Sequence, residues 1–449
     1  MKKVLTKLLC LTMAVGMSVS ILASCGGGED PAAGKTKVIF WSPQFSETET
    51  HVWLQKYTNL YNETNEKNTY IELSIIPEDV WDQKLKAAQE NGTAPEIIFV
   101  NYAEIPSKAM LGNYTALDEY MSPEVWDDLS ENVQEMVEVQ GKHYVYPAFV
   151  EPYSMLFYSK SAFEEAGLDP NAPPKSWEEM YEYAKKLTKE GRYGIEMPAA
   201  KDLGWVMWGF QAMKGEYLLN DNWDAADVNN DYYRDLFTIF RKIYQENLTI
   251  RVASSSYKEI TPLGQGKVAM QLSGSWAMGQ LKNDYPDKVD DIGYAVCPTW
   301  TGETEGVTTA ALGGWGFSLD GNAKHPEEAG AFIEWLLAGD PEYMYEFFKE
   351  LGFSKFTARK SVDELLNTRE ESKNDAFRAF TSEYVLPYAV AEPCYPWAIS
   401  KEFADSLNAV EIMGTIDVNK TLASLQSKLE GIIESDGLAG TNPRYKAEE

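Results

Sequence analysis

The sequence has few of the residues that build metal centres and nucleophilic active sites. Its 449 residues include only four cysteines and three histidines. It contains no C-x-x-C pair, no H-E-x-x-H segment and no G-x-S-x-G segment, so the motifs of structural zinc sites, zinc hydrolases and serine hydrolases are missing. His325 stands beside Pro326 at a predicted helix start, where capping is its expected role. We therefore expect no metal, no cofactor and no catalytic residue.

Positive charge is also scarce. Lysine and arginine number 40 against 69 aspartate and glutamate residues, which gives a formal net charge of −29 at pH 7. Proteins that bind nucleic acid or dock on anionic lipid need a basic face. The composition therefore argues against both kinds of partner. Hydrophobic residues at 44% and charged residues at 24% are ordinary globular usage, and the length suggests two or three domains.

Long hydrophobic runs are missing after residue 24. Before that point, three lysines precede an uncharged apolar stretch from Leu8 to Leu22. This arrangement is typical of a secretory signal peptide, which we place at residues 1–24. No later stretch reaches the length of about 18 apolar residues that spans a bilayer, so we expect no transmembrane helix in the mature chain.

The end of this leader predicts a lipid anchor. The segment Leu22-Ala-Ser-Cys-Gly26 resembles the lipobox of bacterial lipoproteins, in which the cysteine takes the lipid. Residues 25–36 are rich in glycine and carry no hydrophobic periodicity, so we assign them as the lipidated Cys25 and a flexible tether. We therefore expect an exported protein held by Cys25 on the outer face of the bacterial cell membrane.

Two cysteines remain in the mature body, Cys297 and Cys394. In an exported protein they could form one disulfide, or they could be buried free thiols. The sequence leaves both alternatives open.

Residues 36–100 predict a parallel sheet. An apolar run at 38–41 is followed by a helical stretch, an alternating strand at 70–76, a second helix and the continuous apolar strand Ile97-Ile-Phe-Val100. This βαβαβ order with a fully buried strand favours a parallel sheet covered on both faces.

The middle of the chain predicts a crossing and several further elements. Residues 142–160 form two extended segments that we expect to pass between lobes. Ser176 and Glu179 are spaced as a capping box at the start of a helix that ends near Gly191. Further helices are expected at 231–246 and 326–338, and strands at 267–272 and 292–296.

Aromatic residues are abundant, with 13 tryptophans and 26 tyrosines, which is more than a core of this size requires. Several of them stand beside loop-forming residues at predicted strand ends, where ligands of open α/β sheets bind. Indole and phenol faces suit the C–H faces of sugar rings, and carboxylates and amides bind hydroxyl groups. The candidates of this kind are Trp41 with Gln44, Asn101 with Tyr102, Glu151 with Tyr153, Trp276, and Trp315.

Several ordered segments between residues 36 and 435 form a recognisable set. The segments are Met155-Leu-Phe-Tyr-Ser-Lys160, Ala166-Gly-Leu168, Pro173-Pro174, Trp177-Glu-Glu179, Gly266-Lys-Val-Ala-Met270 with Gly274 and Trp276, Pro95-Glu-Ile-Ile98, and Gly313-Gly-Trp-Gly-Phe-Ser-Leu319. Together they resemble segments of the extracellular solute-binding proteins (family 1) of ABC sugar importers, substrate-binding lipoproteins that include the maltose-binding protein. Ser159 and Glu96 replace the usual Asn and Asp, and the ligand does not follow from the resemblance.

The resemblance implies a two-lobe α/β fold of the periplasmic-binding-protein type (type II), with a hinge and a ligand cleft between the lobes. It places residues 37–150 and 295–338 in the N-terminal lobe, and 151–294 and 339–449 in the C-terminal lobe.

The resemblance also assigns roles to single residues and partners. It makes Trp276 a sugar-stacking residue, Glu151 a hydroxyl acceptor and Trp397 a further contact, and Trp205 completes the set of candidates. It implies a monomer that delivers a carbohydrate to the membrane permease subunits of an ABC transporter.

Two alternatives remain open. A secreted glycan-degrading hydrolase would release new reducing ends from oligosaccharides, whereas a binding protein would not. A binding protein for another solute, such as a peptide or a polyamine, is the third hypothesis.

Overall fold

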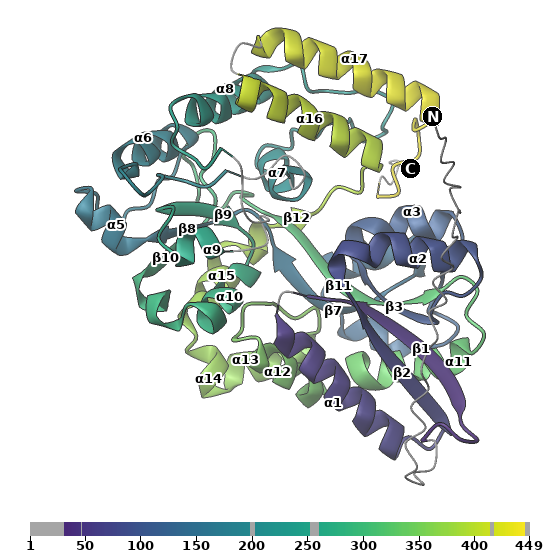
Figure 1. Cartoon of the computed structure of the whole chain (residues 1–449). Helices are drawn as coiled ribbons and strands as arrows, with labels where there is room; N and C mark the ends of the chain where they lie inside the picture. Colours follow the sequence, from purple (N-terminus) through teal and green to yellow (C-terminus); the bar gives the residue numbers. More distant parts are fainter. Residues whose placement is uncertain (1–30, 46, 198–202, 252–259, 414–416, 445–449) are drawn as a thin grey trace, which may run out of the picture.

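The computed structural model describes residues 31–45, 47–197, 203–251, 260–413 and 417–444. The predicted signal peptide and Cys25 lie outside these residues. The described chain is a mixed α/β structure with two separate sheets (Figure 1), and a short hairpin joins β5 (Glu138–Val139) to β6 (Lys142–His143).

The larger sheet has the strand order β12-β11-β3-β1-β2, and β4 and β7 also pair with β11. Its strands are β1 (Thr36–Pro43), β2 (Thr69–Ile76), β3 (Ile97–Asn101), β4 (Tyr114–Thr115), β7 (Tyr146–Pro152), β11 (Ala311–Asp320) and β12 (Val390–Ala391).

The first three strands confirm the order predicted for residues 36–100. β1 runs parallel to both β2 and β3. All five residues of β3 are buried, as expected for a strand covered on both faces. The sheet as a whole is mixed, because β11 is antiparallel to both β3 and β7. The chain reaches β11 from the second sheet, so the direction of this strand depends on distant structure and not on its local pattern.

The helices that accompany this sheet have apolar stripes. On α1, the side chains of Trp53, Leu54, Tyr57 and Tyr61 are buried, with the three- and four-residue spacing of one helix face. The helices of this part are α1 (Thr48–Thr64), α2 (Trp81–Glu90), α3 (Ile105–Met110), α4 (Glu131–Val137), α11 (Pro326–Ile333) and α12 (Pro341–Glu350), with the 3-10 turns η1 (Glu78–Val80), η2 (Tyr102–Glu104) and η3 (Pro123–Asp128).

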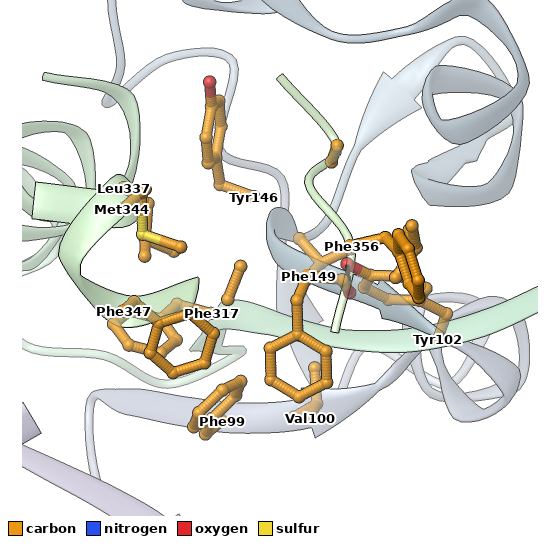
Figure 2. Packing of buried hydrophobic residues seen from close by; sticks show 14 of the residues in the cluster. Phe99, Val100, Tyr102, Tyr146, Phe149, Phe317, Leu337, Met344, Phe347 and Phe356 are labelled. Atoms are coloured by element: carbon orange, nitrogen blue, oxygen red, sulfur yellow. Dashed lines mark hydrogen bonds between the residues drawn. The ribbon is translucent and has the colours of Figure 1, made fainter. Parts of the chain in front are cut away.

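Aromatic side chains fill the core beside β3, β7 and β11. The ring centroids of Phe99 and Phe317 lie 4.8 Å apart in an edge-to-face arrangement, and those of Phe149 and Phe347 lie 5.6 Å apart in a stacked one. Figure 2 shows these four rings gathered around the strands. Since each ring comes from a different element, this cluster ties the sheet to α12.

The smaller sheet is antiparallel, with the order β10-β8-β9. Alternate residues of β8 serve two cores: Met155 and Phe157 belong to the cluster shared with the larger sheet, whereas Leu156 and Tyr158 belong to a second cluster under the helices. The strands are β8 (Met155–Ser159), β9 (Met270–Ser273) and β10 (Ile292–Ala295), which confirms two strands near the predicted positions.

The helices around the smaller sheet confirm the predicted start signals. The Ser176 side chain accepts a hydrogen bond from the Glu179 backbone N–H, and the Glu179 carboxylate accepts one from the Ser176 backbone N–H. The capping box is therefore formed. The helices are α5 (Lys160–Glu165), α6 (Trp177–Leu187), α7 (Leu203–Ala212), α8 (Asp231–Gln245), α9 (Thr261–Gly264), α10 (Trp276–Asp284), α13 (Lys360–Thr368), α14 (Glu370–Lys373), α15 (Ala376–Tyr384), α16 (Trp397–Met413) and α17 (Val418–Asp436), with η5 (Pro286–Asp291) and η7 (Leu386–Tyr388).

The helix predicted for 326–338 is present, but it is an α-helix only in its first part. α11 starts with Pro326, and its last turns, Glu334–Ala338, form a π-helix. His325 is the N-cap residue, but its side chain makes no capping bond. Instead, His325 Nδ1 lies 2.7 Å from Glu96 Oε1.

The chain passes between the parts around the two sheets more than once. β7 of the larger sheet continues into β8 of the smaller sheet through Tyr153 and Ser154, as predicted for the extended segments of 142–160. The connection from β10 to β11 brings the chain back to the larger sheet. The segment after β12 leads from the larger sheet to α16 (Figure 1).

Two further features concern the sequence predictions. α12, which the sequence places with residues 339–449 in the predicted C-terminal lobe, contacts α1: Trp53 Nε1 donates to the Tyr343 carbonyl oxygen at 3.0 Å. The lobe boundaries stay a prediction. Cys297 and Cys394 are both buried free thiols, so this structure has no disulfide between them.

Candidate functional site

The crossing from β7 to β8 places Tyr153 and Ser154 between the two sheets. Ser154 has a φ of 68°, in the left-handed region that side chains other than glycine seldom adopt. Gly209 on α7 lies directly against it, because a Cβ at position 209 would be 2.2 Å from Ser154 Oγ. Strained backbone in close contact with a glycine is typical of a site where geometry matters more than stability.

Three aromatic side chains meet at this crossing. The ring centroid of Tyr153 lies 5.4 Å from that of Trp276 and 6.1 Å from that of Trp208, both in edge-to-face arrangements. We call Tyr153, Trp208 and Trp276 the aromatic trio. The members are 3%, 7% and 6% exposed, so a solute can reach their faces only if the surrounding segments separate.

Two glycines make room for the trio. A Cβ at Gly274 would lie 1.9 Å from a ring carbon of Trp276, and one at Gly313 would lie 2.2 Å from the Tyr153 hydroxyl oxygen. The Trp276 indole folds back over Gly274 at the start of α10 and is buried.

An acid from a distant segment lies next to the trio. Glu392 follows β12 and is fully buried. Burial raises the pKa of Glu392 to about 8, although Arg444 and Tyr153 act in the opposite direction. Its carboxyl group is therefore mostly protonated at pH 7 and can donate as well as accept a hydrogen bond.

Glu151 is part of a buried ion cluster. Lys355 Nζ lies 2.8 Å from Glu151 Oε2 and 3.0 Å from Glu47 Oε1, and all three side chains are less than one tenth exposed. Burial alone would lower the pKa of Lys355, but the two carboxylates outweigh it and raise that pKa. Glu151, which was predicted as a hydroxyl acceptor, has an ionic partner within the protein.

Asn101 and Tyr102 hold the end of β3. The Tyr102 hydroxyl lies 2.9 Å from the Phe149 carbonyl oxygen and 2.8 Å from that of Trp315, and the side chain is completely buried. Tyr102 is therefore placed to join three strands. Asn101 Oδ1 accepts from the Ala103 backbone N–H at 2.9 Å, while its Nδ2 is buried without a hydrogen-bond partner. This Nδ2 is an unsatisfied donor at the end of β3.

The other candidates are not drawn into the trio. Trp41 lies beneath Lys84, whose Nζ is 4.8 Å from the ring centroid, and Gln44 is exposed. Trp315 packs edge-to-face on Phe45 at 5.0 Å. Trp397, at the start of α16, is 71% exposed. The side chain of Trp205 lies outside the described part of α7.

Sequence reasoning missed Trp208, Glu392 and Lys355. Trp208 had a local signal, because it stands three residues after the candidate Trp205, on the same side of a helix. Glu392 and Lys355 had none, because their partners come from segments far away along the chain.

Neither metal binding nor membrane spanning has support in the described ranges. No group of three or more histidine, cysteine or acidic side chains there could hold a metal ion. No helix among the described residues is long and apolar enough to cross a bilayer.

Comparison with solved structures supports the fold. A solute-binding protein of an ABC transporter from Thermotoga lettingae, solved with bound alpha-D-tagatose, superposes with a TM-score of 0.75 over 89% of this chain and 100% of its own, at 20% identity. This likeness confirms the predicted two-lobe α/β fold.

Curated relatives match at low identity. A probable amino-acid ABC transporter periplasmic-binding protein of Sinorhizobium fredii is 26% identical over 196 residues, which is 42% of each chain. A maltotriose-binding protein of Pyrococcus abyssi is 23% identical over 377 residues, 81% of this chain and 74% of its own. The chain thus spans less than half the length of the first of these relatives.

A sequence model of one family covers most of the chain. The model described as bacterial extracellular solute-binding protein matches residues 46–340, which begin after β1 and contain the crossing, the aromatic trio and β11. This confirms the resemblance found in the sequence. Since the match extends over more than half of the 449 residues, this chain belongs to the bacterial extracellular solute-binding protein family.

Proposed function

We propose that this protein is the substrate-binding lipoprotein of an ABC importer and captures a sugar or oligosaccharide between its two lobes. The observation that carries the proposal is the aromatic trio at the crossing from β7 to β8. Three aromatic side chains, with the protonated carboxyl group of Glu392 beside Tyr153, suit a ligand with both C–H faces and hydroxyl groups. The names of the maltotriose-binding relative and the tagatose-bound structure support the same class of solute.

Membership of an extracellular bacterial family implies an exported protein. The finer proposal is that Cys25 carries a lipid, that the protein acts as a monomer, and that it hands its solute to membrane permease subunits. In this proposal the protein has no enzymatic activity.

A binding screen tests the proposed function. Neutral mono- and oligosaccharides, amino acids, peptides and polyamines are added to the Cys25→Ser chain, and its melting temperature is measured. A solute present at 100 times its Kd should stabilise the protein by about 2.7 kcal/mol. Stabilisation by amino acids, peptides or polyamines alone would contradict the sugar proposal.

An assay for new reducing ends separates binding from hydrolysis. The same saccharides that stabilise the protein are incubated with it for hours. We expect no increase in reducing ends, and an increase that scales with protein concentration would favour the hydrolase alternative.

Membrane attachment is a separate prediction. Cys25→Ser should move the protein from the membrane fraction to the soluble fraction, because it removes the sulfur that takes the lipid. A Cys10→Ser variant, which changes a cysteine inside the predicted signal peptide, serves as the control and should stay with the membrane. A Cys25→Ser variant that sediments like the parent would show that the anchor lies elsewhere.

A further inference from the structure

A pocket of about 210 Å³ lies next to the candidate site, at the C-terminal end of the described chain. Three segments that are far apart in sequence form it: 217–223, 391–395 and 442–444. The ring centroids of Trp223 and Tyr395, which both line it, lie 6.1 Å apart. Pockets for whole drug-sized ligands measure about 300 to 1,000 Å³, so this one suits a single terminal group of a solute.

The C-terminal segment is held in place by hydrogen bonds. The Gly440 backbone N–H donates to the Asn222 carbonyl oxygen at 2.7 Å, and Asn442 Nδ2 donates to the Asp221 carbonyl oxygen at 2.8 Å. The Arg444 backbone N–H then donates to Asn442 Oδ1 at 3.1 Å. Arg444 is therefore positioned by the fold and lines the pocket.

The Arg444 guanidinium is only partly satisfied. Its Nη1 donates to the Glu392 carbonyl oxygen. Its Nε and Nη2 are buried and have no hydrogen-bond partner. No ion pair joins Arg444 to a carboxylate in the part of the chain that the structure describes, although acids outnumber bases 69 to 40 in the whole sequence.

Unused donors of this kind have a preferred partner. Nε and Nη2 lie on one edge of the guanidinium plane, and this edge matches the two oxygens of a carboxylate or phosphate. A buried donor without a partner is costly, so a ligand that satisfies both donors gains affinity. The pocket also contains Asp221, which would accept a hydroxyl group but repel a second anion.

The pocket adjoins the aromatic trio through Glu392. Arg444 contacts the backbone of Glu392, and Tyr153 is close enough to lower the pKa of the Glu392 carboxyl. Burial raises the pKa of this carboxyl to about 8, although the Arg444 guanidinium acts in the opposite direction.

We propose that the pocket lined by Arg444, Trp223 and Tyr395 is a subsite for one oxyanion of the solute, bound by Nε and Nη2 of Arg444. The captured sugar is then acidic, and its charge is the carboxylate of a uronic acid or a phosphate group. This inference rests on the proposed function and specifies the substrate class of the same site.

Calorimetric titration of the Cys25→Ser chain tests the inference. The probes are galacturonate and its oligosaccharides, glucuronate, glucose 6-phosphate and inorganic phosphate, each compared with the neutral sugar of the same ring. We expect acidic sugars to bind at least 10-fold more tightly than their neutral counterparts. Preference for the uronates or for the phosphates identifies the source of the oxyanion.

Substitutions locate the effect. Arg444→Gln should weaken binding of the preferred acidic sugar at least 10-fold and weaken binding of its neutral counterpart far less. Arg444→Lys keeps the charge and loses the paired donors. Its affinity for the acidic sugar should therefore lie between that of the parent and that of Arg444→Gln. Arg251→Gln removes an exposed arginine elsewhere and should change nothing.

The outcomes separate the inference from the proposed function. Neutral sugars that bind as tightly as acidic ones, with Arg444→Gln unchanged, would overturn the subsite and leave the sugar-binding function intact. Equal weakening of both classes, with a lower melting temperature, would show that Arg444 only supports the fold and would also overturn the subsite. Binding of no sugar of either class would overturn the proposed function itself.

Discussion

Trp276 combines two roles in one side chain, because it is buried and it belongs to the aromatic trio. Trp276→Ala should weaken sugar binding by roughly 30-fold to 1,000-fold, the usual effect of truncating an aromatic anchor. It should also lower the free energy of unfolding by about 3 to 5 kcal/mol, because a buried indole is lost. Titration calorimetry and urea unfolding measure the two effects separately.

A matched control uses Trp177, which is 3% exposed and lies on α6, outside the trio. Trp177→Ala should lower the free energy of unfolding by a similar amount without a change in affinity. If Trp276→Ala lost stability but kept its affinity, Trp276 would be a core residue and not a ligand contact.

Glu392 makes stability depend on pH. Its pKa is about 8 in the folded protein, against 4.5 for an ordinary glutamate, with burial as the main cause. Between these two values the folded protein holds a proton that the unfolded chain has lost. The free energy of unfolding should therefore fall as pH rises from about 4.5 to 8, by at most about 1.4 kcal/mol per pH unit from this group.

Glu392→Gln should flatten that decline, because the amide does not titrate. Unfolding curves at pH 5, 6, 7 and 8 provide the measurement. Burial also raises the pKa of Glu411, on α16. Glu411→Gln is therefore the comparison, and it should reduce the pH dependence of the free energy of unfolding independently of Glu392→Gln. An unchanged slope in Glu392→Gln would mean that Glu392 is ionised in the folded protein at neutral pH.

At the level of elements, the ion cluster of Glu47, Lys355 and Glu151 joins three segments. Glu47 precedes α1, Glu151 lies on β7 and Lys355 follows α12. Lys355→Met would remove the positive charge that bridges two buried carboxylates. We expect it to lower the free energy of unfolding by about 3 to 5 kcal/mol, as measured by urea denaturation.

The triple variant Lys355→Met, Glu47→Gln, Glu151→Gln is the control for this prediction. It removes all three charges together, so most of the lost stability should return. A triple variant as unstable as Lys355→Met alone would contradict the view that the loss comes from burying the two carboxylates without the lysine charge.

At the level of the whole molecule, the buried aromatic trio implies that the lobes must separate before a sugar enters. Only a few connections cross between the sheets, so rotation about them is the motion we expect. Small-angle scattering should show a smaller radius of gyration in the saturated complex than in the unliganded protein. An unchanged radius at saturation would argue against this hinge motion.

Local patterns determined most of the elements. The capping box at Ser176, the buried strand β3 and the amphipathic helix α8 each depend on residues that are neighbours in sequence, and the structure confirms them. The segment motifs also identified the family, which the family match confirms. These features are predictable because hydrophobic periodicity and capping act within a few residues.

Tertiary structure alone decided how the site is assembled. Glu151 contacts Lys355 across 204 positions of the sequence, and the trio brings Tyr153 together with residues of α7 and α10. The sequence also did not predict the antiparallel direction of β11 or the contact of α12 with α1. Such pairings depend on which distant segments fold together, and neither the periodicity nor the chemistry of a single segment encodes its partner.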